Sequence, residues 1–93
     1  MSNRAAQTEA DEFGAFVRRI VRAYGRRVAD RDIEALAGLA ELRGELDAAI
    51  DQAVVGLVAS GYSFTDIGDA LGVSRQAARQ RHVRRMGWAA DRS

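Results

Sequence analysis

The sequence predicts an all-α protein, with an N-terminal antiparallel helical hairpin followed by a C-terminal helix-turn-helix. Three observations favour this fold class. The 93 residues include no proline, most of the apolar residues are Ala, Leu, Val or Ile, and these recur at intervals of three and four. Sheet proteins normally carry more turn residues and more β-branched runs. The length suits one compact domain, which we divide into residues 1–8, 9–60 and 61–88.

The first helix is expected to follow a disordered tail of residues 1–8. Thr8 is its predicted N-cap, with Asp11 three residues later in the manner of a capping box. Four arginines lie opposite an apolar stripe, and we expect them to form a solvated face; a contact with phosphates or an acidic partner is the alternative. The stripe consists of Phe13, Phe16, Val17, Ile20, Val21, Tyr24 and Val28, and the arginines are Arg18, Arg19, Arg22 and Arg26.

A turn is expected from Gly25 through residues 26–32, and Asp30 is the predicted N-cap of a second helix, residues 31–59. Part of its apolar stripe has heptad spacing. Each glycine inside it weakens the helix by ~1 kcal/mol relative to Ala, so a break near Gly44 is the alternative to one continuous helix. The stripe consists of Ile33, Leu36, Leu39, Leu46, Ile50, Val54, Leu57 and Val58, and the outer face carries Glu34, Glu41 and Glu45.

Residues 9–60 are interpreted as a hairpin because neither helix can bury its stripe alone. The hairpin ends at Ser60 and Gly61, and Gly61 suits the left-handed conformation that closes a helix. A second copy of the protein is expected to cover the rest of the stripe, since a monomer would not need so long a hairpin. The hairpin is therefore a scaffold or dimerisation arm. Packing of the stripe against the C-terminal helices of the same chain is the alternative.

The C-terminal part contains the predicted helix-turn-helix. Ser63 caps its first helix, and Asp66 completes the capping box. Gly72 takes the left-handed turn position, and Ser74 caps the second helix, residues 74–86.

The two short helices are expected to pack closely against each other. Ile67 and Leu71 form the buried face of the first helix, and Ala78 is buried against them. Gly68 lacks a side chain and so allows the two helices to cross closely. Val73 is expected to anchor the turn by packing its side chain in the core.

Charge is distributed unevenly along the chain although the net charge is only +1. Residues 30–51 hold seven acids against two arginines, whereas residues 74–86 hold five arginines and no acid. A basic helix in a nearly neutral protein indicates that the positively charged surface suited to nucleic acid is confined to one face.

A known family shares this pattern. The helix-turn-helix in the C-terminal promoter-reading domain of bacterial sigma factors resembles Ile67-Gly68, two further residues, and Leu71-Gly72-Val73-Ser74-Arg75-Gln76-Ala77-Ala78. The resemblance covers about 25 residues. The first 60 residues do not resemble the rest of a sigma factor, so a stand-alone regulator fits better.

The resemblance implies that the second helix enters the major groove of DNA. It implies base contacts by Arg75, Gln76 and Arg79, because Arg suits guanine O6 and N7 and Gln suits adenine N6 and N7. The implied backbone contacts come from Ser63, Thr65, Ser74, Arg81, Arg84 and Arg85.

One position departs from the family pattern. His82 stands where the family usually carries a large apolar residue. We expect a half-buried packing histidine; a DNA contact or a pH-sensitive cap is the alternative. Val83, Met86 and Trp88 are then expected to supply the apolar side chains that close the core.

The sequence thus predicts a sequence-specific double-stranded DNA-binding protein, a transcriptional regulator acting as a homodimer. The alternative is a protein-interaction adaptor that binds RNA polymerase or a sigma factor through residues 31–59. A cytoplasmic, nucleoid-associated protein is expected, because no apolar run is long enough for a membrane span and no signal peptide is apparent.

An enzyme is not expected, and neither is a metal or a cofactor. Cysteine is absent and His82 is the only histidine. Asp66 and Asp69 are explained by capping and solvation, and no glycine-rich phosphate loop is present.

Overall fold

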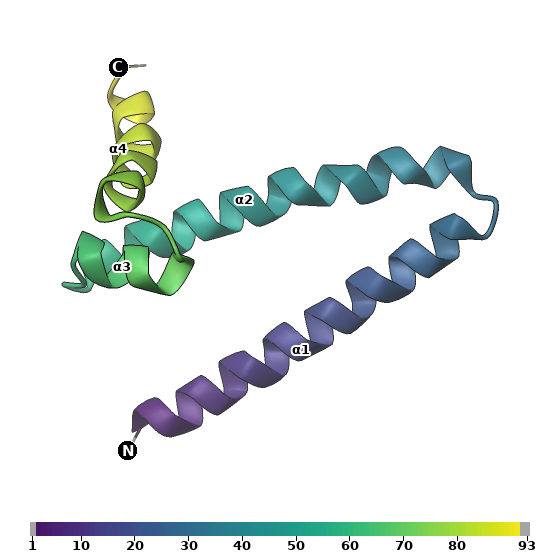
Figure 1. Cartoon of the computed structure of the whole chain (residues 1–93), viewed down its shortest axis with the longest axis horizontal. Helices are drawn as coiled ribbons and strands as arrows, with labels where there is room; N and C mark the ends of the chain where they lie inside the picture. The colour runs from purple at the N-terminus through teal and green to yellow at the C-terminus, as the bar shows by residue number, and fades with distance from the viewer. Residues whose placement is uncertain (1, 92–93) are drawn as a thin grey trace. The chain divides into compact units, whose positions relative to one another are not determined.

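The computed structural model describes the backbone of residues 2–91 and the side chains of residues 5–85. Every regular element in that range is helical, which confirms the predicted all-α class for the described residues. The elements are α1 (Ser2–Ala29), the 3₁₀ helix η1 (Ile33–Ala35), α2 (Leu36–Ala59), α3 (Phe64–Leu71) and α4 (Arg75–Asp91) (Figure 1). The chain divides into two units, residues 1–42 and residues 43–93. No described helix has both the length and the apolarity needed to cross a membrane.

Helix α1 is longer at both ends than the sequence patterns predicted. It begins at Ser2, so residues 2–8 are helical where a disordered tail was predicted, and the predicted cap at Thr8 lies inside the helix. Alanine, glutamine and glutamate are common in this segment and favour the helix. The helix also continues through Gly25 to Ala29, because one interior glycine costs only about 1 kcal/mol and the stripe on either side stays in register.

The turn between α1 and η1 is correspondingly short, and Asp32 rather than the predicted Asp30 caps the element that follows. The Asp32 carboxylate accepts a hydrogen bond from the Ala35 N–H at 3.3 Å. Arg31 has a φ of 68°, which lets the chain leave α1. Beyond the turn, a Cβ atom at Gly38 would lie 2.9 Å from the Tyr24 Oη, so the absence of a side chain at this position admits the tyrosine.

Helix α2 runs without a break through Gly44, as the continuous-helix interpretation predicted. It ends at Ala59, where two hydrogen bonds close the last turn. The Gly61 N–H donates to the Val58 carbonyl at 3.0 Å, and the Tyr62 N–H donates to the Leu57 carbonyl at 3.1 Å. Gly61 has a φ of 99°, which confirms its predicted left-handed conformation.

The caps around α3 also form as predicted. The Ser63 Oγ accepts from the Asp66 N–H at 3.0 Å, and the Asp66 carboxylate accepts from the Ser63 N–H at 3.2 Å. Gly72 is left-handed, with a φ of 72°. The Ser74 Oγ accepts from the Ala77 N–H at 3.0 Å and so caps α4. Helices α3 and α4 contact each other and cross at this turn (Figure 1).

A small core joins the three helices of the second unit. Val54 of α2, Ile67 of α3 and Ala78 of α4 are at most 3% exposed. This confirms the expected burial of Ile67 and Ala78. Three half-buried side chains pack around them: Ile50, Val58 and Phe64.

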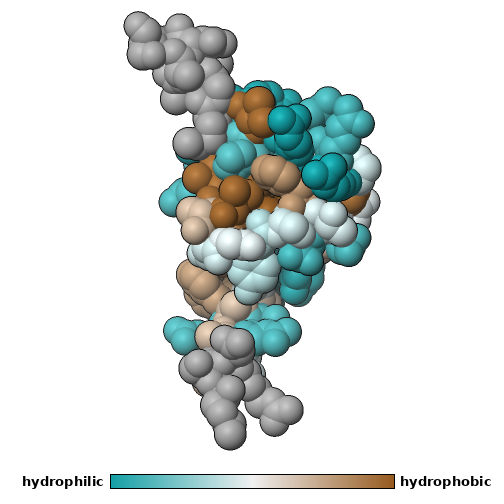
Figure 2. Space-filling view, turned by 90° about the vertical axis from the view of Figure 1, so that its left-hand side faces the viewer, coloured by the Kyte–Doolittle hydropathy of each residue, from teal (hydrophilic) through white to brown (hydrophobic). Residues whose placement is uncertain are grey.

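Two predicted core positions are wrong. Leu71 is 39% exposed and Val73 is 44% exposed, so neither is buried at the turn. The reason is that no described element of this unit covers the end of α3 at the turn, where Leu71 and Val73 line an open groove together with Ile50 of α2. Apolar residues (brown) accordingly reach the surface among polar ones (teal) in Figure 2.

Gly68 is the position where α3 tolerates a side chain least. A Cβ there would lie 2.8 Å from the Val73 carbonyl oxygen and 3.1 Å from backbone atoms of Ser74. We expect Gly68→Ala to lower the free energy of unfolding by about 1–3 kcal/mol, since backbone rather than a flexible side chain must move. Urea unfolding followed by circular dichroism measures this change.

Gly56→Ala is the matched control within α2. A Cβ at Gly56 meets no atom within 4 Å. The control is expected to gain up to about 1 kcal/mol from helix propensity. A gain of similar size in Gly68→Ala would show that the close crossing does not exist.

Candidate nucleic-acid interface

The buried Ala78 fixes which side of α4 faces outward. At about 100° per residue, Gln76 and Gln80 point most directly away from the core, and Arg79 and Arg84 flank them on either side. These four side chains are exposed, and so is Arg75 at the start of the helix. The exposure of Arg75, Gln76 and Arg79 is as the sequence led us to expect; their contact with bases stays a prediction.

Gln80 is a candidate that the sequence reasoning missed. It lies one helical turn after Gln76 and shares the same exposed face. The interval of four residues between two glutamines was the available signal. Both carry an amide that donates and accepts hydrogen bonds, as a base edge requires.

Polar groups stand at the starts of α3 and α4. Ser63, Thr65 and Ser74 are exposed. The hydroxyl oxygens of Ser63 and Ser74 each accept a backbone N–H, so each hydroxyl keeps its own hydrogen available as a donor. The N-terminus of α4 adds a partial positive charge beside Ser74. These groups suit a negatively charged ligand such as a phosphate.

Four of the five arginines between residues 75 and 85 extend this positive surface. Arg75, Arg79, Arg84 and Arg85 form no ion pair with another described residue, whereas Arg81 does. Within the same stretch there is no acidic residue.

Arg81 is engaged in a contact that the sequence did not reveal. Its Nη1 lies 2.9 Å from the Asp51 Oδ1 of α2, and both side chains are half-buried. Neither atom has another hydrogen-bond partner. The pair ties α4 to α2, and a partly exposed pair of this kind contributes about 0–1 kcal/mol. A phosphate contact by Arg81 stays a prediction, but its charge is already balanced by Asp51.

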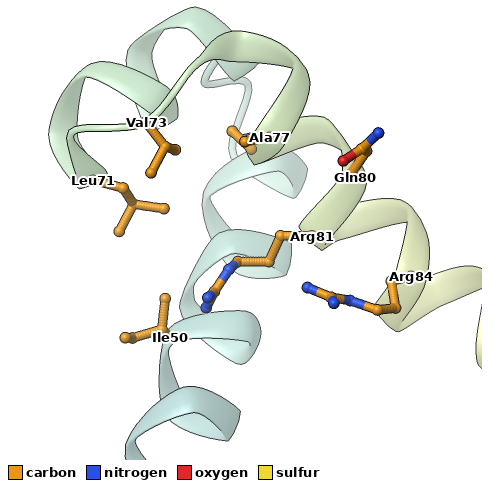
Figure 3. Close-up of a pocket in the computed structure, with 8 residues that line it drawn as sticks. Ile50, Leu71, Val73, Ala77, Gln80, Arg81 and Arg84 are labelled. Atoms are coloured by element: carbon orange, nitrogen blue, oxygen red, sulfur yellow. The ribbon is translucent and has the colours of Figure 1, made fainter.

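A groove borders the interface at the α3–α4 turn (Figure 3). It has a volume of about 590 Å³. Its apolar side includes Ile50, Leu71 and Val73, and the side chains of Arg81 and Arg84 line the opposite part (Figure 3). Leu71 and Val73 are exposed because they line this open groove.

His82 packs as expected from its half-buried position. Its ring centroid lies 5.5 Å from that of Phe64, with the rings tilted by 58°. Val83 is 47% exposed, so its predicted role in closing the core is wrong. The side chains of Met86 and Trp88 lie outside the described residues.

Comparisons with known proteins add no constraint: no family model, no curated protein and no solved structure matches the chain. Among the residues placed by the structure, no three His, Cys, Asp or Glu side chains come together as metal ligands would.

Proposed function

We propose that the protein binds double-stranded DNA in a sequence-specific manner, as a transcriptional regulator that inserts α4 into the major groove. The observation that carries this proposal is the outward face of α4. It presents arginine and glutamine side chains directly after a capped glycine turn, and residues 75–85 include no acid. The resemblance of residues 67–78 to the sigma-factor helix-turn-helix supports the same assignment.

Base reading is assigned to the first two turns of α4. Arg75 and Arg79 suit guanine, and Gln76 suits adenine. Gln80 joins them because it lies on the same exposed face. Backbone positioning is assigned to the remaining exposed groups, which are Ser63, Thr65, Ser74, Arg84 and Arg85, with Arg81 in a lesser role because of Asp51.

The proposal includes a homodimer whose two copies of α4 read half-sites about one helical turn apart. In each chain, α1 and α2 form an antiparallel hairpin that serves as the dimerisation arm. The contact between α1 and η1 and the position of the Tyr24 Oη next to Gly38 support the reversal of the chain at the turn that such a hairpin requires. A nucleoid location follows from this function.

A protein-interaction adaptor is the second candidate, with RNA polymerase or a sigma factor as its partner. It is favoured by Leu46 and Leu57, which are exposed on α2, and by the acidic Glu41 and Glu45. Recovery of polymerase subunits by an immobilised protein that retains no DNA would favour the adaptor.

Salt dependence of binding tests the DNA proposal. Fluorescence anisotropy with a labelled random-sequence duplex is expected to show binding that weakens steeply between low and physiological salt. The logarithm of affinity should fall with a slope of roughly −0.9 for each phosphate neutralised, so four free arginines predict a slope near −3.6. No binding at low salt, or binding that salt leaves unchanged, contradicts the proposal.

Asp51→Asn is expected to strengthen DNA binding. The change removes the partner of Arg81 and frees its charge for a phosphate, so the salt slope should become steeper by about one. The same anisotropy titration measures it. Asp47→Asn is the matched control, because it removes an equal charge from an exposed position one turn earlier on α2. Equal slopes for the two variants would show that Arg81 does not respond to its partner.

A further inference from the structure

The groove at the α3–α4 turn leaves apolar surface uncovered. Its volume of about 590 Å³ falls within the roughly 300–1,000 Å³ that small-molecule sites in proteins occupy. Leu71 and Val73 lie on its apolar side and are 39% and 44% exposed. Their side chains point toward Ile50 across the groove (Figure 3). An occupant that covers this surface therefore needs an apolar part.

Two arginines of α4 line the other side of the same groove. The Arg84 guanidinium points toward Arg81 (Figure 3). Arg81 pairs with the Asp51 carboxylate at 2.9 Å, whereas Arg84 forms no ion pair with another described residue. One carboxylate thus stands against two guanidinium groups, and none of the described residues that line the groove is acidic. The groove keeps an excess of one positive charge, and this charge lies beside the apolar side chains rather than on another face.

The two properties together favour an aliphatic carboxylate as the occupant. A guanidinium group binds a carboxylate through two parallel hydrogen bonds, and the Gln80 amide, which also lines the groove, can donate another. The apolar part of the lining is aliphatic: Ile50, Leu71, Val73, Ala77 and Ala78. A DNA phosphate would satisfy Arg84 but has no apolar part to cover Leu71 and Val73. A neutral apolar molecule would leave the charge of Arg84 without a partner.

The groove shares residues with the candidate nucleic-acid interface. Gln80 lies on the exposed face assigned to base reading, and Arg84 is assigned to the DNA backbone. A ligand that pairs with Arg84 neutralises one charge that would otherwise meet a phosphate. Occupation of the groove is therefore expected to oppose DNA binding.

We propose that the groove binds a small carboxylate with an aliphatic body, which pairs with Arg84 and so weakens DNA binding. The ligand site rests on the lining of the groove alone. The regulatory effect rests on the proposed function, so ligand binding is measured first without DNA and the two can fail separately.

Nuclear magnetic resonance of the full chain, titrated with sodium octanoate, tests the ligand site. Saturable shifts are expected in the backbone amide signals of Leu71, Val73, Gln80 and Arg84. The matched neutral probe is 1-octanol, which has the same chain length and should bind about tenfold more weakly or worse, because it lacks the charge-assisted hydrogen bonds.

Two variants separate the groove from general positive charge. Arg84→Gln is expected to weaken octanoate binding about tenfold, because it removes the unpaired guanidinium. Arg85→Gln is the matched control, since Arg85 carries the same charge but does not line the groove, and its octanoate binding should equal that of the wild type. Equal affinity for octanoate and 1-octanol, equal weakening in the two variants, or shifts confined to residues 13–21 would overturn the proposal.

Anisotropy titrations with a labelled duplex test the regulatory effect. Saturating octanoate is expected to lower the DNA affinity of the wild type about fivefold or more, as coupled ligands commonly do, and to leave that of Arg84→Gln unchanged. Sodium acetate at the same concentration is the control, because it supplies the salt and the carboxylate without the aliphatic body. An unchanged DNA affinity with the groove filled overturns the regulation. Octanoate shifts in a protein that binds no duplex would instead support the ligand site and count against the proposed function.

Discussion

Replacing both Arg75 and Arg79 with alanine is expected to abolish most of the preference for one DNA sequence over another. Each bidentate contact between an arginine and a guanine supplies about 1–3 kcal/mol of discrimination. Two such contacts therefore predict a loss of roughly 30-fold to 20,000-fold in affinity for the preferred duplex. Both side chains are exposed on a helix whose rotation is fixed by the buried Ala78, so the substitutions remove contacts without opening the core. Anisotropy titrations at one fixed salt concentration measure the loss.

Arg84→Ala/Arg85→Ala is the matched control, since it removes the same charge from further along α4. This control should weaken binding to all duplexes by a similar factor and reduce the salt slope by about two. The ratio of specific to non-specific affinity should stay close to that of the wild type. If the two double variants lose the same specificity, α4 does not read bases through its first turns.

The largest effect on stability is expected from Ile67→Ala. Ile67 is one of three buried core residues among those described, and it belongs to a core built from three helices. Truncation of a buried isoleucine costs about 2–5 kcal/mol, which is a large part of the 5–15 kcal/mol that stabilises an ordinary small domain. Urea unfolding is expected to show a midpoint far below that of the wild type, with weaker DNA binding as α4 loses its support.

Leu71→Ala serves as the control for this prediction. Leu71 lies on the same short helix but is 39% exposed in the groove at the turn. Its truncation removes less buried surface and leaves no closed cavity, so a loss of about 1 kcal/mol is expected. Equal losses for the two variants would mean that Leu71 is as buried as Ile67, as the sequence had first led us to expect.

Local chemistry explains what could be predicted from the sequence. The capping box of Ser63 and Asp66 and the left-handed Gly72 depend on residues within four positions of each other. The same holds for the cap at Ser74. Their geometry is set by backbone hydrogen bonds that any chain with these residues can form, so the pattern alone sufficed.

Contacts between helices explain what could not be predicted. The exposure of Leu71 and Val73 depends on how far α2 extends along α3, which no periodicity encodes. The ion pair of Arg81 with Asp51 joins residues 30 positions apart. The first cap was misplaced because Thr8 competes with a segment whose composition already favours helix.

Part of the candidate interface could be predicted from local capping chemistry, and part required the contacts between helices. The exposure of Arg75, Gln76 and Arg79 followed from the turn chemistry, because Ser74 sets where α4 begins and Ala78 sets its rotation. Gln80 was found only when the exposed face was known. That these residues read bases is a prediction, and it rests on the exposed arginine and glutamine side chains of α4.

Selection of bound sequences from a pool of random duplexes tests the central claim most directly. The wild-type protein is expected to enrich one motif, arranged as two half-sites about 10 base pairs apart, with guanine and adenine at the positions read by arginine and glutamine. The Arg75→Ala/Arg79→Ala variant is expected to lose the guanine positions of that motif. A wild-type pool that stays random after several rounds, or a variant that enriches the same motif as the wild type, would contradict the account.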